Sequence, residues 1–252
     1  RNGLSLRWPD GRTVTVGVPA VRLPRECAPE GADVIFVAVS AYDTVAAAPL
    51  IRTLLAPSGI CITLQNGLDN QPTLAEALGA SRAVQGATSF AVHLAAPSEV
   101  QINSAGATWL PPLPPRFAWL TRLLAEAGLN PVLSDDPVAL GWRKTAIATN
   151  GYVCLILASP MGAILRCGSA RKVAERACME ILEVAAAAGV DIDRAEVLEL
   201  LQAAWKKSNK DARSSFYNDF LAGRRTELED RLGTVLRRAS GLKVPVPTLE
   251  TL

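Results

Sequence analysis

The sequence feature that most constrains the fold is a pair of short, continuous apolar runs, each followed by a helical pattern. Residues 34–39 read VIFVAV and residues 60–64 read ICITL. Runs of this length and composition are typical of strands covered on both faces. Helices are predicted after them, over residues 43–55 and 72–78. This order predicts parallel strands joined by helical crossovers, and therefore an α/β domain.

Functional groups in such sheets gather beyond the carboxyl ends of the strands. By that rule Ser40 and Asn66, which closely follow the two runs, are expected at the active edge. Residues 83–112 predict shorter and more exposed strands. A helix over residues 116–127 and a strand near Val132 are expected to close the domain.

The second half of the chain has a different pattern. Residues 137–158 predict one long, mostly apolar helix, and apolar residues recur every four positions within residues 171–188. Two further segments repeat that helical face. We therefore expect a partial Rossmann-like parallel-sheet domain over residues 1–135, followed by an all-helical domain over residues 136–252.

Composition excludes several classes of protein. The 252 residues carry 26 Lys and Arg against 24 Asp and Glu, a net charge of +2, which argues against nucleic-acid binding through a broad basic surface. No apolar run approaches the roughly 20 residues that span a bilayer. Five scattered cysteines and one histidine exclude a disulfide scaffold and predict no metal site. Unpaired cysteines fit a reducing compartment, so we expect a cytoplasmic protein that binds no membrane.

Two features of the sequence could carry chemistry on their own. Asn66-Gly67 directly follows a predicted buried strand, either as a turn or as an amide held over a cofactor or substrate. Lys144 lies in an apolar helical segment. Its long stem could take the charge to water. Alternatively, it is a partly desolvated ammonium that protonates or polarises a carbonyl oxygen.

A third candidate segment reads SSFYND at residues 214–219 and RRTELE at residues 224–229. Thr226 and Glu229 have the spacing of a helix capping box. Glu227 is either a first-turn carboxylate favoured by the helix dipole or a group that accepts hydrogen bonds from sugar hydroxyls.

Together, in order and spacing, these features match a family. The chain resembles the ketopantoate reductases, which reduce 2-dehydropantoate with NADPH on the way to pantothenate. The resemblance covers essentially the whole chain, from Arg1-Asn2-Gly3-Leu4 to Pro245. Its strongest markers are LQNGL at 64–68, QGAT at 85–88, WRK at 142–144, RTEL at 225–228 and GLKVP at 241–245.

The resemblance implies a Rossmann domain joined to a helical domain, with the active site in the cleft between them. Lys144 would bind the substrate and donate the proton to the forming alkoxide. Asn66 would contact the substrate as well as the cofactor. Ser215, with Asn218 beside it, would hold the hydroxyl or carboxylate of the substrate.

The resemblance also implies an NADPH site. Glu227 would hydrogen-bond the nicotinamide ribose, Asn66 would contact the nicotinamide side, and Val92 would line the cofactor by its backbone. Ser40 falls in the same site, where the family usually carries a Lys.

The chain departs from the family pattern in two further ways. It contains no GxGxxG turn to seat a pyrophosphate, so we expect that a piece ahead of Arg1 is missing, because the remaining sheet would expose an apolar edge and face. The positions four and eight beyond Lys144, where the family has substrate-binding Asn residues, hold Ala148 and Tyr152, while Asn150 is expected to point away from the Lys144 face. For a hydroxylated substrate, each of the two missing amides should weaken the binding free energy by about 1–3 kcal/mol if its partner group stays unpaired.

The sequence thus predicts an NADPH-dependent reductase of 2-dehydropantoate, with a small 2-keto acid as substrate and apolar helix faces that allow a homodimer. Ala148 and Tyr152 favour an alternative, a reductase of another branched 2-keto acid. The missing glycine-rich turn and Ser40 favour another, a non-catalytic family member that acts as a binding protein.

Overall fold

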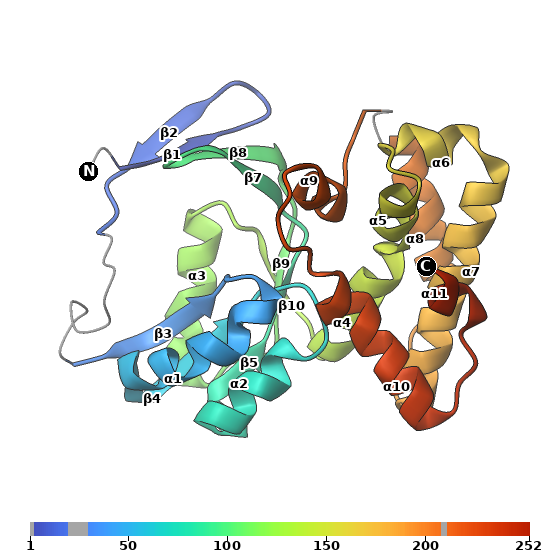
Figure 1. Ribbon diagram of the computed structural model, residues 1–252. Helices are drawn as coiled ribbons and strands as arrows, with labels where there is room; N and C mark the ends of the chain where they lie inside the picture. Colours follow the sequence, from blue (N-terminus) through green and yellow to red (C-terminus); the bar gives the residue numbers. More distant parts are fainter. Residues whose placement is uncertain (1–2, 20–29, 208–210) are drawn as a thin grey trace. The chain divides into compact units, whose positions relative to one another are not determined.

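The computed structural model describes residues 3–19, 30–207 and 211–252 (Figure 1). Arg1, Asn2 and Cys27, which the sequence interpretation used, lie outside the described residues. The chain forms two compact units. The first holds the described residues up to Ala38, Val45–Gln65 and Gln71–Pro137, and the second holds Val39–Thr44, Asn66–Asn70 and Val138–Leu252. Two short segments from the first half of the chain therefore belong to the second unit. A single domain boundary near residue 135 leaves these two segments in the first domain.

The first unit contains a three-stranded parallel sheet with strand order β3-β4-β5. Its elements in chain order are β3 (Ala32–Val37), α1 (Thr44–Leu54), β4 (Leu55–Thr63), α2 (Asn70–Leu78) and β5 (Ala83–Gln85). Val34 lies opposite Ile60, and Cys61 lies opposite Ala83. The parallel register confirms the α/β fold with helical crossovers that the apolar runs predict.

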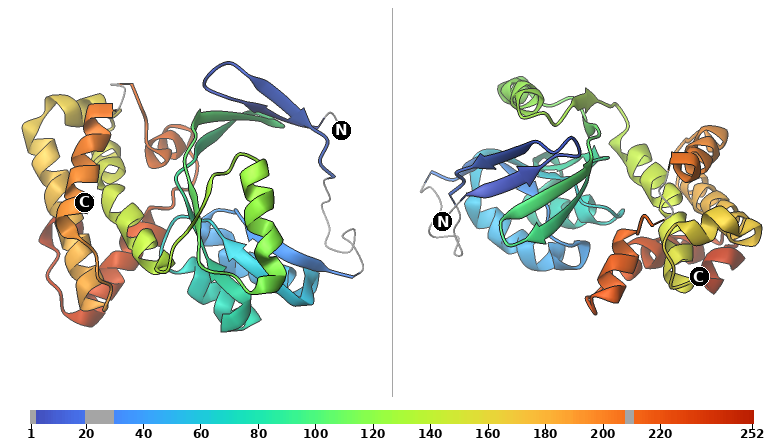
Figure 2. Two further views of the ribbon diagram at one scale, coloured as in Figure 1. Left: turned by 180° about the vertical axis from the view of Figure 1, so that it is seen from behind. Right: turned by 90° about the horizontal axis from the view of Figure 1, so that it is seen from above.

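Helices cover both faces of the central strand β4 (Figure 2). Cys61 packs in one apolar cluster with Ile51 of α1 and with residues of α2. Ile62 packs on the other face with Leu120 of α3 (Ala118–Glu126). Neighbouring residues of a strand point to opposite faces, so a strand covered on both must be apolar throughout. Full burial of one such side chain contributes about 1.5–3 kcal/mol.

Strand β3 differs from the prediction that both of its faces are covered. It is an edge strand of this sheet, and the Phe36 side chain is 39% exposed. It also ends at Val37, two residues before the apolar run does. Among the described residues no strand pairs with its outer edge, so side chains there lack the neighbours that bury their counterparts on β4.

The remaining strands form two further sheets in the first unit, one of four strands and one of three. One has the order β2-β1-β8-β7, with β1 (Leu4–Arg7), β2 (Thr13–Val16), β7 (Ala91–Ala96) and β8 (Glu99–Ser104). The other has the order β10-β9-β6, with β6 (Ala87–Thr88), β9 (Thr108–Leu110) and β10 (Pro131–Leu133). Strands β6, β7, β8 and β9 confirm the shorter, more exposed strands expected over residues 83–112.

The second unit is helical, as predicted. Its helices are α4 (Pro137–Ile147), α5 (Thr149–Ile156), α6 (Gly162–Arg166), α7 (Gly168–Ala187), α8 (Arg194–Lys207), α9 (Ser215–Leu221), α10 (Thr234–Leu242) and α11 (Pro247–Thr251), with a π-helical turn at Glu229–Gly233 before α10. Ala177, Ile181 and Ala185 of α7 are fully buried in its core, which confirms the periodic apolar face. No helix in the described ranges is long and apolar enough to cross a membrane.

The single long helix predicted over residues 137–158 is wrong, because the helix is interrupted at Ala148. The Thr149 hydroxyl donates to the carbonyl oxygen of Ala146 at 2.9 Å. The Gly151 N–H donates to the Ala148 carbonyl at 2.7 Å, a tighter i to i+3 bond. A threonine hydroxyl that bonds to the preceding turn competes with the backbone ladder and often bends a helix.

Candidate active site

The loop after β3 is joined to the segment before α10 within the second unit. The Ala41 N–H donates to Glu227 Oε1 at 2.9 Å, between residues 186 positions apart. Glu227 therefore caps the loop after β3 and not the first turn of its own helix. Ser40, next to Ala41, is half-buried. The bond places the predicted cofactor residues Ser40 and Glu227 beside each other.

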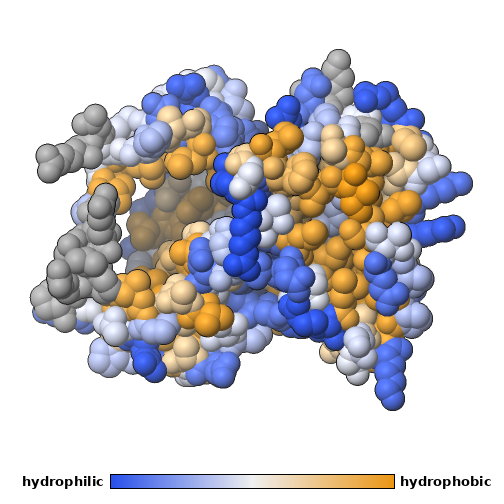
Figure 3. Space-filling view, in the orientation of Figure 1, coloured by the Kyte–Doolittle hydropathy of each residue, from blue (hydrophilic) through white to orange (hydrophobic). Residues whose placement is uncertain are grey.

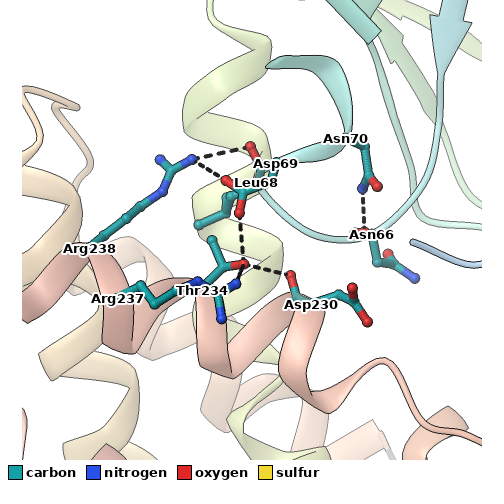
Figure 4. A network of polar contacts seen from close by, with 8 residues as sticks. All are labelled: Asn66, Leu68, Asp69, Asn70, Asp230, Thr234, Arg237 and Arg238. Atoms are coloured by element: carbon teal, nitrogen blue, oxygen red, sulfur yellow. Dashed lines mark hydrogen bonds and ion pairs between the residues drawn. The ribbon is translucent and has the colours of Figure 1, made fainter. Parts of the chain in front are cut away.

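The dipeptide Asn66-Gly67 lies in a sharp bend of the chain, in agreement with the first interpretation of its sequence (Figure 4). Gly67 has φ +105°, and a Cβ atom there would lie 3.3 Å from the Asp230 carbonyl oxygen, so glycine is required. The Asn70 side-chain amide donates to the Asn66 carbonyl at 2.8 Å. Within the described part of the chain the Asn66 side-chain amide has no hydrogen-bond partner. The turn thus fixes the backbone of Asn66 and leaves its side chain to bind something else.

A polar network anchors this turn to α10 (Figure 4). The Asp69 carboxylate accepts from the Arg238 guanidinium at 2.6 Å and from the Thr234 hydroxyl at 2.9 Å. Arg238 also donates to the Leu68 carbonyl at 3.3 Å and lies over the ring of Trp142, 5.4 Å from its centroid. Charge-assisted hydrogen bonds of this kind are stronger than neutral ones, so they hold the turn firmly in place.

Lys144 lies in the last turn of α4, two residues after the fully buried Trp142. The side chain is half-buried, and its pKa is lowered from 10.5 to about 8. Burial is the largest cause, the positive charge of Arg231 adds to the lowering, and the carboxylate of Glu227 opposes it. The structure therefore has an ammonium whose pKa is close to neutral pH, as the second interpretation of Lys144 requires.

Arg231, which the sequence interpretation missed, lies beside an aromatic pair. The Tyr152 ring is almost fully buried, and its centroid is 5.2 Å from that of Phe216. The central guanidinium carbon of Arg231 is 4.7 Å from the Phe216 centroid. Arg231 belongs to the π-helical turn, a local structure that is frequent at functional sites. Its one sequence signal is a charge inserted between the apolar positions Leu228 and Leu232.

The two predicted substrate residues of α9, Ser215 and Asn218, are both exposed. The neighbouring Ser214 is the helix N-cap, because its hydroxyl accepts from the Tyr217 N–H at 3.1 Å. The Ser215 hydroxyl is therefore not the group that caps this helix.

Two other predictions have different outcomes. Val92 belongs to the first unit, where it lies on β7 with its side chain 54% exposed. The capping box of Thr226 and Glu229 is wrong, since in the described segments Glu229 pairs with Arg237 and has no hydrogen bond to Thr226. The second unit contains Arg231 and all the predicted site residues except Val92, namely Ser40, Asn66, Lys144, Ser215, Asn218 and Glu227.

The chain is similar to known proteins over almost its whole length. The family model described as ketopantoate reductase PanE/ApbA matches residues 1–115, and the model of its C-terminal part matches residues 138–252. The chain therefore belongs to the ketopantoate reductase PanE/ApbA family of oxidoreductases. It is 29% identical to the 2-dehydropantoate 2-reductase of Halobacterium salinarum, over 100% of this chain and 83% of that protein.

Solved structures show the same fold. A PanE/ApbA family ketopantoate reductase from Ralstonia eutropha JMP134 has a TM-score of 0.89 and 26% identity, covering 99% of this chain and 82% of that one. The 2-dehydropantoate 2-reductase from Geobacter metallireducens GS-15 has a TM-score of 0.87 and 27% identity, covering 100% and 84%. These likenesses confirm the predicted family and fold class.

Proposed function

We propose that this protein reduces 2-dehydropantoate to pantoate with NADPH. The observation that carries the proposal is Lys144, a half-buried ammonium whose pKa is lowered to about 8 and which shares its unit with Asn66 and Glu227. Family membership and relatives named 2-dehydropantoate 2-reductase supply the substrate.

Reduction of a ketone needs a hydride at the carbonyl carbon and a proton at the carbonyl oxygen. NADPH, when bound, supplies the hydride. Lys144 donates the proton to the oxygen, and its positive charge stabilises the negative charge that develops there. An ammonium with a pKa near 8 is mostly charged at pH 7 and is a stronger acid than an ordinary lysine. Asn66 orients the substrate carbonyl through its side-chain amide, which the fixed turn presents.

The polar groups present suit the nicotinamide ribose of the cofactor. Only Oε1 of Glu227 accepts from Ala41, and Oε2 has no hydrogen bond from the residues described, so it can accept from a ribose hydroxyl. The Ser40 hydroxyl and the Asn66 amide can complete this end of the site. We propose that the Val92 backbone lines the cofactor as well. Phosphate recognition is not assigned, because the 252 residues contain no GxGxxG turn.

On the substrate side, Ser215 and Asn218 offer an exposed hydroxyl and an exposed amide within the same unit as Lys144. We assign them to the polar groups of the keto acid. Both sit on α9, which packs against α5. Substrate contacts would therefore depend on the position of α5.

The test is NADPH oxidation with 2-dehydropantoate, followed at 340 nm. The protein should carry whatever residues its coding sequence places ahead of Arg1. We expect turnover with NADPH that is faster than with NADH. Failure to bind NADPH in a fluorescence titration would refute the reductase and favour the non-catalytic alternative.

A second candidate function is reduction of a different branched 2-keto acid. The observation that favours it is Tyr152, which presents a buried ring packed on Phe216 where a substrate-binding amide was expected. An aromatic wall suits an apolar side group better than a hydroxylated one. A panel of 2-keto acids that differ in side-chain hydroxylation separates the two functions, since the ratio of kcat/KM values identifies the preferred substrate.

We also propose a homodimer. Figure 3 shows apolar side chains gathered on the helical unit over the region of α5 and α9. At the ends of these helices Ile156, Leu157, Phe220 and Leu221 are about half exposed. Large apolar side chains that gather on an exposed surface commonly mark an interface. Light scattering coupled to size-exclusion chromatography tests this, and Phe220→Glu should shift a dimer toward the monomer.

A further inference from the structure

Arg231 is a buried cation that the proposed mechanism does not use. Its side chain is only 6% exposed. Among the described residues no carboxylate lies within 4.0 Å of its guanidinium, and its buried Nε has no hydrogen-bond partner. Asp230, its neighbour in sequence, also has a buried carboxylate oxygen without a partner, so the two charges are not paired with each other. A buried charge without a partner is costly, and an anionic ligand would remove that cost.

A second buried donor lies next to Arg231. The Tyr152 hydroxyl has no hydrogen bond of good geometry in the described part of the chain, and the residue is 1% exposed. Both side chains contact the same Phe216 ring. The Tyr152 ring centroid is 5.2 Å from the Phe216 centroid, and the central guanidinium carbon of Arg231 is 4.7 Å from it. Burial, the largest effect, raises the pKa of the Tyr152 hydroxyl, while the charge of Arg231 and a side-chain hydrogen bond from Arg231 to the Tyr152 oxygen lower it. The Tyr152 O–H remains free to donate. A guanidinium and a hydroxyl thus form a donor pair on one aromatic support.

The cation of this donor pair acts on the proposed proton donor. After burial, the charge of Arg231 has the largest effect on the pKa of Lys144. In a 2-keto acid the carboxylate is bonded directly to the ketone carbon. A group that binds the carboxylate must therefore lie next to the group that protonates the ketone oxygen. The charge of Arg231 acts on Lys144 and both residues belong to the second unit, as this requirement demands.

We propose that Arg231 and Tyr152 bind the carboxylate of the 2-keto acid substrate, with the guanidinium as the main anchor and the Tyr152 hydroxyl as an additional donor. This inference rests on the proposed function, since it names the group that selects keto acids over uncharged ketones. A guanidinium matches a carboxylate in bidentate geometry, which a lysine cannot reproduce. Phe216 keeps the plane of the guanidinium in place by stacking on it.

Four variants test the proposal: Arg231→Met, Arg231→Lys, Tyr152→Phe and, as a control, Arg122→Gln. Arg122 is an exposed arginine of the first unit that pairs with Glu126, so its loss removes one charge from the surface. We expect Arg231→Met to raise KM for the keto acid about 10- to 100-fold. Arg231→Lys should recover part of that loss, Tyr152→Phe should raise KM about 3- to 10-fold, and Arg122→Gln should change nothing. The NADPH dissociation constant should be unchanged in all four.

Binding is measured separately from reduction, so that this inference and the proposed function fail differently. The probes are pantoate and 2-hydroxyisovalerate with their neutral counterparts pantolactone and methyl 2-hydroxyisovalerate, each tested for thermal stabilisation with and without NADP⁺. We expect at least one acid to stabilise the unmodified protein more than its neutral counterpart, and Arg231→Met to abolish that difference. If the difference persists in Arg231→Met, or if neither acid exceeds its neutral counterpart, the inference is wrong. Absence of turnover with intact, Arg231-dependent acid binding would instead refute the proposed reductase alone.

Discussion

The lowered pKa of Lys144 predicts that the activity declines in mildly alkaline solution. The structure gives a pKa of about 8 where a free lysine has 10.5. That difference corresponds to about 3.4 kcal/mol by which the protein disfavours the charged amine, or a factor of about 300 in proton affinity. Burial is the largest cause, and the charge of Arg231 adds to it. Because the proposed mechanism needs the protonated form, the rate should follow the protonated fraction.

The expected size of the decline follows directly. With a pKa of about 8, about nine-tenths of Lys144 is protonated at pH 7 and about one-tenth at pH 9. The value of kcat/KM, which reports the free enzyme, should therefore fall about tenfold over this interval. With an unshifted pKa of 10.5, more than about nine-tenths would stay protonated at pH 9 and the rate would hardly change.

The assay is the initial rate of NADPH oxidation at subsaturating keto acid between roughly pH 6 and pH 10, at constant ionic strength. This range spans the lowered pKa of about 8 and ends below the ordinary value of 10.5. Arg231→Met is the matched variant, because removing the cation that lowers the pKa should move the alkaline limb to higher pH whatever it does to KM. A profile that is flat to pH 9.5, or an alkaline limb that Arg231→Met leaves in place, would refute the reasoning.

Three further predictions concern the rest of the site. Glu227→Gln removes a carboxylate that raises the pKa of Lys144, so the alkaline limb should move to lower pH and the NADPH dissociation constant should rise; an unchanged limb would show that the two groups do not interact. Gly67→Ala forces a side chain into a φ of +105° and should lower the free energy of unfolding by about 1–3 kcal/mol, measured by urea denaturation. A wild-type midpoint would contradict the turn geometry. Trp205→Phe deletes the 2.5 Å hydrogen bond to buried Asn150 and should cost about 1–3 kcal/mol of stability with kcat/KM unchanged, whereas a kinetic defect would place Asn150 in the site.

The order of elements in the first unit is predictable from sequence because it depends on local patterns. The run at residues 60–64 predicts a strand covered on both faces, and β4 is such a strand with α3 on one side. The run at residues 34–39 looks the same locally, yet β3 is an edge strand with Phe36 exposed. Position within a sheet depends on which strands pair, and the hydropathy of one run carries no information about that.

The α4–α5 interruption could not be read from periodicity either. Every residue from 145 to 149 is compatible with a helix, and the break arises from the bond that the Thr149 hydroxyl makes to the Ala146 carbonyl. The expectation that Asn150 points away from the Lys144 face is consistent with the structure, where Asn150 accepts a hydrogen bond from Trp205 in the core. Whether a threonine hydroxyl such as that of Thr149 bonds to the preceding turn or to another acceptor is decided by tertiary packing.

Long-range contacts account for the remaining differences in the site. The bond between Ala41 and Glu227 joins residues 186 positions apart, and the pair of Asp69 and Arg238 joins residues 169 apart. No local pattern encodes such pairs. The family resemblance supplied Asn66 and Glu227 as site residues, but it gave no reason to single out Arg231, whose importance follows only from its burial and its neighbours.

The most direct test of the central claim is NADPH oxidation with 2-dehydropantoate by the unmodified protein, by Lys144→Ala and by Lys172→Ala. Lys172 is an exposed lysine of α7 and controls for the loss of one surface charge. We predict turnover by the unmodified protein and by Lys172→Ala, with kcat reduced about 100-fold or more in Lys144→Ala while NADPH still binds. Equal turnover by Lys144→Ala would contradict the account, because the proton would then come from another group.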